Sequence, residues 1–215
     1  MLKIAPSILS ANLSDIKNEV KLVDKAGAEM IHVDIMDGHY VNNITFGPNI
    51  VRAIRPFTKK KIDVHLMISP VSYFVNDFIN AGADIISFHP EADPHPIKTL
   101  EKIKNLNCKC GIAIHPKFDV FKFKKYFSIV DNVIIMTVVP GFSGQKFLKK
   151  QLKQIKLLNN YRIEKKFKFE IEVDGGINNQ NSILCKNNGA NIIVAGSYIY
   201  NQSQNKYKKL INSLR

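Results

Sequence analysis

The stretch AGAEMIHVDIMDG, residues 26–38, contains a helix end, a complete strand and the turn that ends the strand. Side chains alternate between the two faces of a strand, so His32, Asp34 and Met36 share one face and the apolar residues between them share the other. A face with imidazole, carboxylate and thioether groups is costly to bury unless something occupies it. A histidine two residues before an aspartate is half of a metal site or an ordinary buried hydrogen-bonded pair, and the strand alone does not decide between them.

The Ala-Gly-Ala joint at residues 26–28 recurs along the chain, and this recurrence indicates the fold. Similar joints at residues 81–83 and 188–190 also connect a helix end to an apolar strand, and glycine suits the left-handed position there. The three glycines are separated by about two and about four steps of roughly 27 residues, and eight such steps are close to the 215 residues of the chain. We therefore expect an α/β fold, a single (β/α)8 TIM barrel, with residues 1–215 as one domain.

Strand and helix patterns alternate through the whole sequence. The strands are near-continuous Val/Ile runs, as expected when both faces of a parallel sheet are buried. An open doubly wound sheet is the alternative, but it usually has fewer strands, and no glycine-rich dinucleotide motif follows the first strand here. The predicted strands are 3–7, 30–36, 61–67, 84–88, 109–114, 132–138, 167–173 and 191–195, and the predicted helices are 14–27, 49–54, 70–82, 96–106, 119–127, 147–160, 179–188 and 200–214.

The composition, 45% hydrophobic and 23% charged, is typical of a globular protein. No apolar run approaches the roughly 18 residues of a membrane span, and the first residues lack the layout of a signal peptide. The cysteines at 108, 110 and 185 form no Cys-x-x-Cys pair, which favours reduced thiols and a cytoplasmic location. We expect no membrane partner.

The formal net charge of +13 invites a nucleic-acid interpretation. The lysines are scattered over many segments, however, and no RNA- or DNA-binding motif accompanies them. Compositional bias explains them better, so we expect no specific nucleic-acid partner. A non-catalytic barrel that binds a polyanion remains the alternative from a different functional class.

The polar residues at the predicted strand ends form a constellation. In a parallel barrel, chemistry takes place at the C-terminal ends of the strands. Two histidines and two aspartates from three strands can bind a divalent transition metal, and the methionines can form a polarisable wall that excludes water. The set is Ser7, His32, Asp34, Met36, His65, Met67, Met136 and Asp174.

Three glycine-bearing loops follow the last three predicted strands. They contain residues 139–145 (VPGFSGQ), 175–176 (GG) and 195–197 (AGS). Glycine lets backbone N–H groups approach an anion, and barrel phosphates commonly bind after the last two strands. Together the loops favour a phosphate-bearing substrate.

Long motifs in the sequence resemble those of the D-ribulose-5-phosphate 3-epimerase family. The resemblance covers essentially the whole chain and is specific because several of the motifs are long. They are PSILSA (6–11), HVDIMDG (32–38), NITFG (43–47), DVHLM (63–67), VPGF (139–142), GQKF (144–147) and VDGGI (173–177).

The resemblance implies a TIM barrel of the ribulose-phosphate-binding type. It further implies an enzyme, usually a homo-oligomer, that interconverts D-ribulose 5-phosphate and D-xylulose 5-phosphate at C3 in the pentose phosphate pathway. Two bases would act through a cis-enediolate covered by Met36, Met67 and Met136. One divalent ion (Zn²⁺, Fe²⁺, Mn²⁺ or Co²⁺) would be bound by His32, Asp34, His65 and Asp174, and Asp34 and Asp174 would also be the catalytic acid/base pair. The implied substrate-binding residues are Ser7, His65, Gly141, Phe142, Ser143, Gly144, Gly175, Gly176, Gly196 and Ser197.

Some positions depart from the family pattern. Val139 stands where the family usually has Asn, Ser143 stands where it usually has Gly, and residues 115–117 are unusual in detail. A ketose-6-phosphate 3-epimerase, such as one for allulose 6-phosphate, is therefore an alternative. A decarboxylase or aldolase of the same barrel class fits less well, since those families use Asp-x-Lys-x-x-Asp where this chain has Asp63-x-His65.

Overall fold

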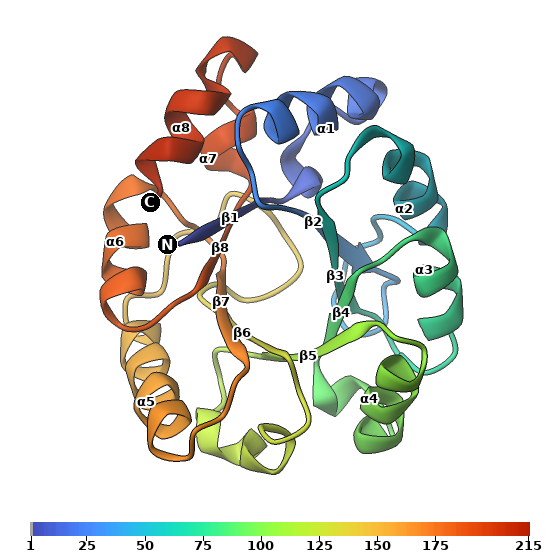
Figure 1. Cartoon of the computed structure of the whole chain (residues 1–215), viewed down its shortest axis with the longest axis vertical. Helices are drawn as coiled ribbons and strands as arrows, with labels where there is room; N and C mark the ends of the chain where they lie inside the picture. Colours follow the sequence, from blue (N-terminus) through green and yellow to red (C-terminus); the bar gives the residue numbers. More distant parts are fainter. Residues whose placement is uncertain (1) are drawn as a thin grey trace.

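The computed structural model describes residues 2–215 and has eight parallel strands in a ring surrounded by helices (Figure 1). The predicted TIM barrel is confirmed. The strands are β1 (Lys3–Pro6), β2 (Met30–Met36), β3 (Lys61–Met67), β4 (Ile85–Phe88), β5 (Lys109–Ile114), β6 (Asn132–Met136), β7 (Glu170–Asp174) and β8 (Ile192–Ala195). The α-helices are α1 (Ile16–Lys25), α2 (Pro48–Ile54), α3 (Val75–Ala81), α4 (Pro96–Asn105), α5 (Gln151–Glu164), α6 (Asn179–Asn187), α7 (Ser197–Tyr200) and α8 (Tyr207–Ser213).

The ring closes between β1 and β2. Neighbouring strands pair in parallel around the rest of the sheet, which runs from β1 through β8 and back to β2. The remaining junction consists of a parallel bridge between Ser7 and His32 and a 3.0 Å bond from the Glu29 N–H to the Ile4 carbonyl. A Glu29 carboxylate oxygen also accepts from the Ile4 N–H at 2.8 Å. The bridge places Ser7, directly after β1, beside His32 of β2.

The three glycine joints end their helices as predicted. Gly27, Gly82 and Gly189 have φ values of 95°, 110° and 107°. In each joint the alanine after the glycine donates its N–H to the carbonyl five residues earlier, at 3.1 Å. This is the pattern of a Schellman helix end, and it turns the chain directly into the next strand.

Some predicted helices differ from the observed ones. Residues Val120–Tyr126 form a 3₁₀ helix and not an α-helix, and α3 begins at Val75 and not at residue 70. The helix predicted from residue 147 begins at Gln151, because the Leu148 N–H donates to the Thr137 carbonyl and keeps the preceding chain extended. The helix predicted over 200–214 is broken into α7 and α8, with a short 3₁₀ turn between them.

The main apolar core lies between the strands and the helices. Ile31, Val33 and Ile35 of β2 point into it, together with Val64 and Leu66 of β3. The inner face of the ring has only small apolar clusters, and buried polar residues lie between them.

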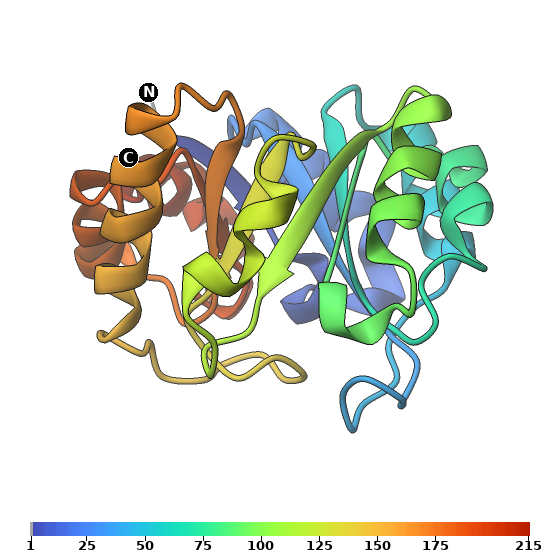
Figure 2. The same cartoon turned by 90° about the horizontal axis from the view of Figure 1, so that it is seen from below.

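The long loops project from one end of the barrel. Figure 2 shows the segment after β2, around residues 37–47, and the segment after β6, around 137–150, at the same lower end, with the two chain termini at the other. This lower end is the C-terminal edge of the strands. Among the helices of residues 2–215, none combines the length and the apolar character needed to cross a membrane.

Candidate active site

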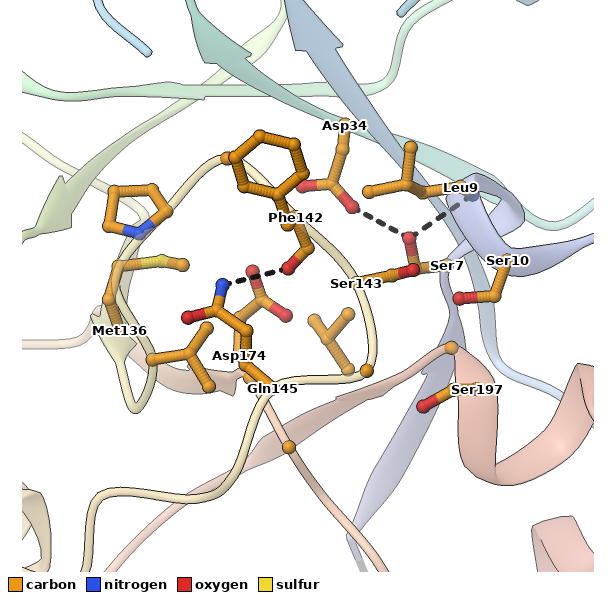
Figure 3. Close-up of a pocket in the computed structure, with 18 of the residues that line it drawn as sticks. Ser7, Leu9, Ser10, Asp34, Met136, Phe142, Ser143, Gln145, Asp174 and Ser197 are labelled. Carbon is orange, nitrogen blue, oxygen red and sulfur yellow. Dashed lines mark hydrogen bonds between the residues drawn. The ribbon is translucent and has the colours of Figure 1, made fainter. Parts of the chain in front are cut away.

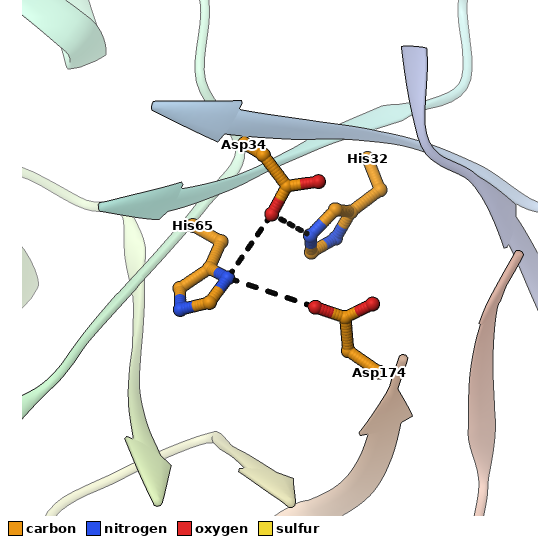
Figure 4. A group of neighbouring side chains, drawn as sticks. All are labelled: His32, Asp34, His65 and Asp174. Carbon is orange, nitrogen blue, oxygen red and sulfur yellow. Dashed lines mark hydrogen bonds and ion pairs between the residues drawn. The ribbon is translucent and has the colours of Figure 1, made fainter. Parts of the chain in front are cut away.

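Four predicted ligand residues converge at the loop-bearing end of the barrel (Figure 4). His32 and Asp34 come from β2, His65 from β3 and Asp174 from β7, and one ligand atom of each lies within 4.8 Å of the others. Asp34 Oδ1 is 3.3 Å from His32 Nε2 and 3.2 Å from His65 Nδ1. His65 Nδ1 is also 3.9 Å from Asp174 Oδ2.

The donor set suits a divalent transition metal. It consists of two imidazole nitrogens and two carboxylate oxygens, the ligands that Zn²⁺ and related ions take in proteins. The histidines are buried, whereas Asp34 and Asp174 also line an open cavity. An ion bound by these four groups would therefore face the cavity, where further oxygen ligands can reach it.

The surroundings shift the pKa values of Asp34 and Asp174 in opposite directions. Burial opposes ionisation of Asp34, but the charge of a protonated His32 outweighs it and holds the pKa of Asp34 well below its usual range. A cation bound at the same place would act in the same direction. Burial and the nearby Asp34 charge raise the pKa of Asp174. Ser7 Oγ donates to Asp34 Oδ2 at 2.6 Å and further favours the ionised form of Asp34. The surroundings therefore favour ionisation of Asp34 more than ionisation of Asp174.

A second polar layer lies deeper inside the ring. His32 Nδ1 is 2.7 Å from Asp63 Oδ2 and 3.3 Å from Glu172 Oε1, and Asn132 donates its amide N–H to the other Glu172 oxygen. Burial and the Asp63 charge raise the pKa of Glu172 to about 7. We did not predict a role for this layer from the sequence. Its signal is the same alternation as in β2, since Asp63 and Glu172 each lie two residues before a predicted ligand.

His89 lies between His65 and Tyr40 of the loop after β2. Its Nε2 is 3.1 Å from His65 Nε2, and its ring stacks on Tyr40 with 4.5 Å between the ring centroids. The Tyr40 hydroxyl donates to Glu91 at 2.8 Å. Burial and the neighbouring His65 lower the pKa of His89, so its ring is neutral.

Most of the predicted substrate-binding residues line one cavity that is open to solvent (Figure 3). Met36, Met67 and Met136 are among the residues that line it. His32 and His65 lie behind the wall and are fully buried. The predicted residues that line it are Ser7, Asp34, Met36, Met67, Met136, Gly141, Phe142, Ser143, Gly144, Asp174, Gly175, Gly176, Gly196 and Ser197, and those not predicted are Leu9, Ser10, Val138, Pro140, Gln145, Ile177 and Val194.

The loop after β6 is held over this cavity by two side-chain amides. Gln145 donates to the carbonyls of Val139 and Phe142, at 2.6 and 2.9 Å. Asn43, from the loop after β2, donates to the Gly141 carbonyl at 2.7 Å. The two rim loops are therefore directly connected.

The residues that follow β7 and β8 form a glycine-rich edge of the cavity, and Gly176 there lies against the loop after β6. A Cβ atom at Gly176 would lie 2.6 Å from the Gln145 carbonyl oxygen and 2.7 Å from the Phe147 nitrogen, and Gly176 has a φ of 65°. Only glycine fits there without moving the backbone. This close approach keeps the loop after β6 next to the end of β7.

The comparison with protein families agrees with the geometry. The model of the Ribulose-phosphate 3 epimerase family matches residues 3–200.

The chain belongs to the ribulose-phosphate 3-epimerase family. It is therefore an epimerase, a class of isomerase. Ribulose-phosphate 3-epimerase from Bacillus subtilis is 47% identical over 216 residues, which cover 100% of this chain and 99% of that protein. The Escherichia coli K12 enzyme of that name is 39% identical, with 99% and 94% covered. The chloroplastic ribulose-5-phosphate-3-epimerase of Arabidopsis thaliana is 44% identical, with 92% and 71% covered.

More distant solved structures share the barrel. A 3-keto-L-gulonate-6-phosphate decarboxylase from Vibrio cholerae superposes with a TM-score of 0.70 at 14% identity, covering 100% of this chain and 95% of that one. A 3-hexulose-6-phosphate synthase superposes with a TM-score of 0.68 at 16% identity, with 99% and 97% covered. At such low identity the likeness extends to the fold alone.

The departures from the family pattern are compatible with the observed backbone. Asn107 and Lys166 are the two non-glycine residues with positive φ among the described residues, so Ser143 has a conformation that any residue adopts. Val139 is 54% exposed and lines a shallow groove beside the main cavity, not the cavity itself. Neither substitution obstructs the site.

Proposed function

We propose that the chain interconverts D-ribulose 5-phosphate and D-xylulose 5-phosphate by inverting C3. The observation that carries the proposal is the pairing of Asp34 with Asp174 across the mouth of the barrel. Inversion next to a ketone requires a proton to leave one face of the carbon and a proton to return to the other. The two carboxyl groups come from β2 and β7, which have β1 and β8 between them in the ring, so they can flank a substrate in the cavity.

The unequal surroundings of the pair favour one assignment of roles. In this proposal Asp34, whose ionisation is the more favoured, takes the C3 proton, and Asp174 supplies a proton to the opposite face. In the reverse direction the two residues exchange roles. The intermediate between the two transfers is a cis-enediolate.

A divalent ion fits the four-residue cluster. When bound by His32, Asp34, His65 and Asp174, it would act as a Lewis acid on the ketone and hydroxyl oxygens of the sugar. Ser7 keeps the Asp34 carboxylate in place, and Met36, Met67 and Met136 exclude water from the reacting carbons. An enediolate that is kept from water is less exposed to side reactions.

The glycine-rich edge is suited to the phosphate group. Gly175, Gly176, Gly196 and Ser197 line the same cavity as the two aspartates. Their backbone N–H groups, together with those of the loop 141–144, would orient the substrate through its phosphate. A fixed phosphate places C3 between the two carboxyl groups.

The experiment combines metal analysis with an assay of two substrates. We expect the purified chain to contain a divalent metal, to convert D-ribulose 5-phosphate, and to incorporate solvent deuterium at C3. Removal of the metal with a chelator should abolish turnover, and Zn²⁺, Fe²⁺, Mn²⁺ or Co²⁺ should restore it. If the chain turned over D-allulose 6-phosphate faster than D-ribulose 5-phosphate, the six-carbon sugar would be the substrate instead. Full activity without metal would overturn the metal-dependent mechanism.

A further inference from the structure

The two ring nitrogens of His32 face different acids. Nε2 points towards Asp34 in the four-residue cluster, at 3.3 Å. Nδ1 points away from the cluster, with Asp63 Oδ2 at 2.7 Å as its nearest acceptor and Glu172 Oε1 at 3.3 Å. A neutral imidazole carries its proton on one nitrogen and offers a lone pair at the other. The shorter contact to a fully buried carboxylate favours a proton on Nδ1, which leaves Nε2 free to bind an ion.

His65 has the opposite orientation and a partner of its own. Its Nδ1 faces Asp34 and Asp174, at 3.2 and 3.9 Å, and its Nε2 lies 3.1 Å from Nε2 of His89. Two ring nitrogens at this distance form a hydrogen bond only if one of them carries a proton. When Nδ1 of His65 is the ligand atom, that proton is on its Nε2 and His89 accepts it.

We infer that Asp63 and His89 are positioning residues that fix the tautomers of His32 and His65, so that the nitrogens facing the two catalytic aspartates are unprotonated. The inference rests on the proposed metal-dependent function. Partners of this kind orient a ligand ring and raise its basicity, and their loss typically weakens metal binding by about 10- to 100-fold. Neither residue lines the substrate cavity.

The position of Asp63 is hard to explain by stability alone. Its side chain is fully buried, and its Oδ1 has no hydrogen-bond partner among the described residues. A buried carboxylate oxygen without a partner destabilises a fold. A role at His32 gives a reason for an acid at this place in the ring.

The first measurement is the Zn²⁺ affinity of the metal-stripped full chain, determined by competition with a chromogenic chelator. We expect Asp63→Asn to bind Zn²⁺ about 10- to 100-fold more weakly than the wild type. His89→Phe, which removes a neutral acceptor but keeps an aromatic ring against Tyr40, should have a smaller effect. The matched control is Asp93→Asn, because Asp93 is also buried but accepts from the N–H groups of Ser72 and His95, and its affinity should stay within about twofold of the wild type.

The second measurement is the histidine ring ¹⁵N NMR spectrum of the Zn²⁺-loaded wild type, which is informative even if a variant fails to fold. We expect His32 to carry its proton on Nδ1 and His65 to carry its proton on Nε2. The reverse tautomers, or an unchanged Zn²⁺ affinity in folded Asp63→Asn, would overturn the inference. A wild type that binds no Zn²⁺ at all would instead refute the metal part of the proposed function.

Discussion

Asp34 and Asp174 are chemically identical side chains that their surroundings make different. The Ser7 hydroxyl and the charge of a protonated His32 favour the ionised form of Asp34, whereas the pKa of the partly buried Asp174 is raised by burial and by the nearby Asp34 charge. In the mechanism proposed above, this difference would let Asp34 begin as the base and Asp174 as the acid. The environment, and not the residue type, would then assign the two roles.

Replacing either aspartate with asparagine should remove one of the two proton-transfer groups. We expect Asp34→Asn and Asp174→Asn each to lower kcat by about 10³-fold or more, because general acid–base catalysis typically contributes about 10²- to 10⁴-fold and both groups are also proposed ligands. Steady-state kinetics measures this loss, and circular dichroism checks that the fold is intact. If either folded variant kept more than about a tenth of wild-type kcat, the two-base mechanism would be wrong.

The four residues of the cluster could be predicted from the sequence, whereas the residues that contact them could not. The strand-end pattern and the family resemblance brought out His32, Asp34, His65 and Asp174, and the structure places all four together. Asp63, His89 and Glu172 were assigned no role, because their contacts depend on strand register. Asp34 is level with His65 across β2 and β3, which brings Asp63 level with His32. A single sequence does not reveal this pairing.

At the level of elements, the absence of a side chain at Gly111 in β5 lets residues of β4 and β6 pack closely against it inside the ring. A Cβ atom there would lie 2.2 Å from Ser87 Oγ on β4 and 3.0 Å from the Asn132 carbonyl oxygen on β6. The ring interior thus requires a residue without a side chain between these two strands.

Gly111→Ala should destabilise the fold by overpacking. We expect the free energy of unfolding to fall by about 1–3 kcal/mol, the usual effect of an extra methyl group in a packed interior. Urea unfolding measures this change. Removing the nearest atom with Ser87→Ala should recover part of the loss in the double variant, and strictly additive effects would contradict the proposed contact.

The bond between the two rim loops is a second feature at this scale. Asn43→Ala removes the donor to the Gly141 carbonyl without touching the aspartates. We expect KM for D-ribulose 5-phosphate to rise about three- to tenfold, which corresponds to a hydrogen bond of about 1 kcal/mol, while kcat changes less. Steady-state kinetics separates the two effects. Asn42→Ala in the same loop is the control, and an equal effect on its KM would show that the Asn43 bond is not responsible.

The elements were predicted with uneven success for physical reasons. Glycine at a helix end is a local signal, so the joints at residues 27, 82 and 189 could be predicted from the sequence. The late start of α5 depends on a bond from Leu148 to Thr137. The 3₁₀ form of residues 120–126 is likewise not encoded in apolar spacing alone. Contacts between distant segments determine such details.

For the whole molecule, an ion bound by the four-residue cluster would link metal binding to folding stability. The ligand atoms come from β2, β3 and β7, so the complete cluster exists only when the ring is assembled. An ion that binds the folded state stabilises it by about 2.7 kcal/mol when its concentration is 100 times Kd.

We therefore expect Zn²⁺ to raise the Tm of the chelator-treated protein by several degrees, and the rise to increase with Zn²⁺ concentration. Differential scanning calorimetry measures the shift. Mg²⁺ at the same concentration is the control, since it prefers oxygen ligands and should have little effect. A Tm that does not respond to any of the four proposed metals would contradict a folded-state metal site.

The closure of the ring between β1 and β2 determines where the barrel opens most easily. This junction has fewer backbone bonds than the ladders between the other strands, so it is the place where the cylinder opens with the least loss of bonding. Ser7 and His32 form the junction, and both contact Asp34. A ligand bound in the site should therefore stabilise the junction between β1 and β2. Hydrogen–deuterium exchange of the β1 amides would then measure ligand binding in an enzyme that has no tryptophan for a fluorescence signal.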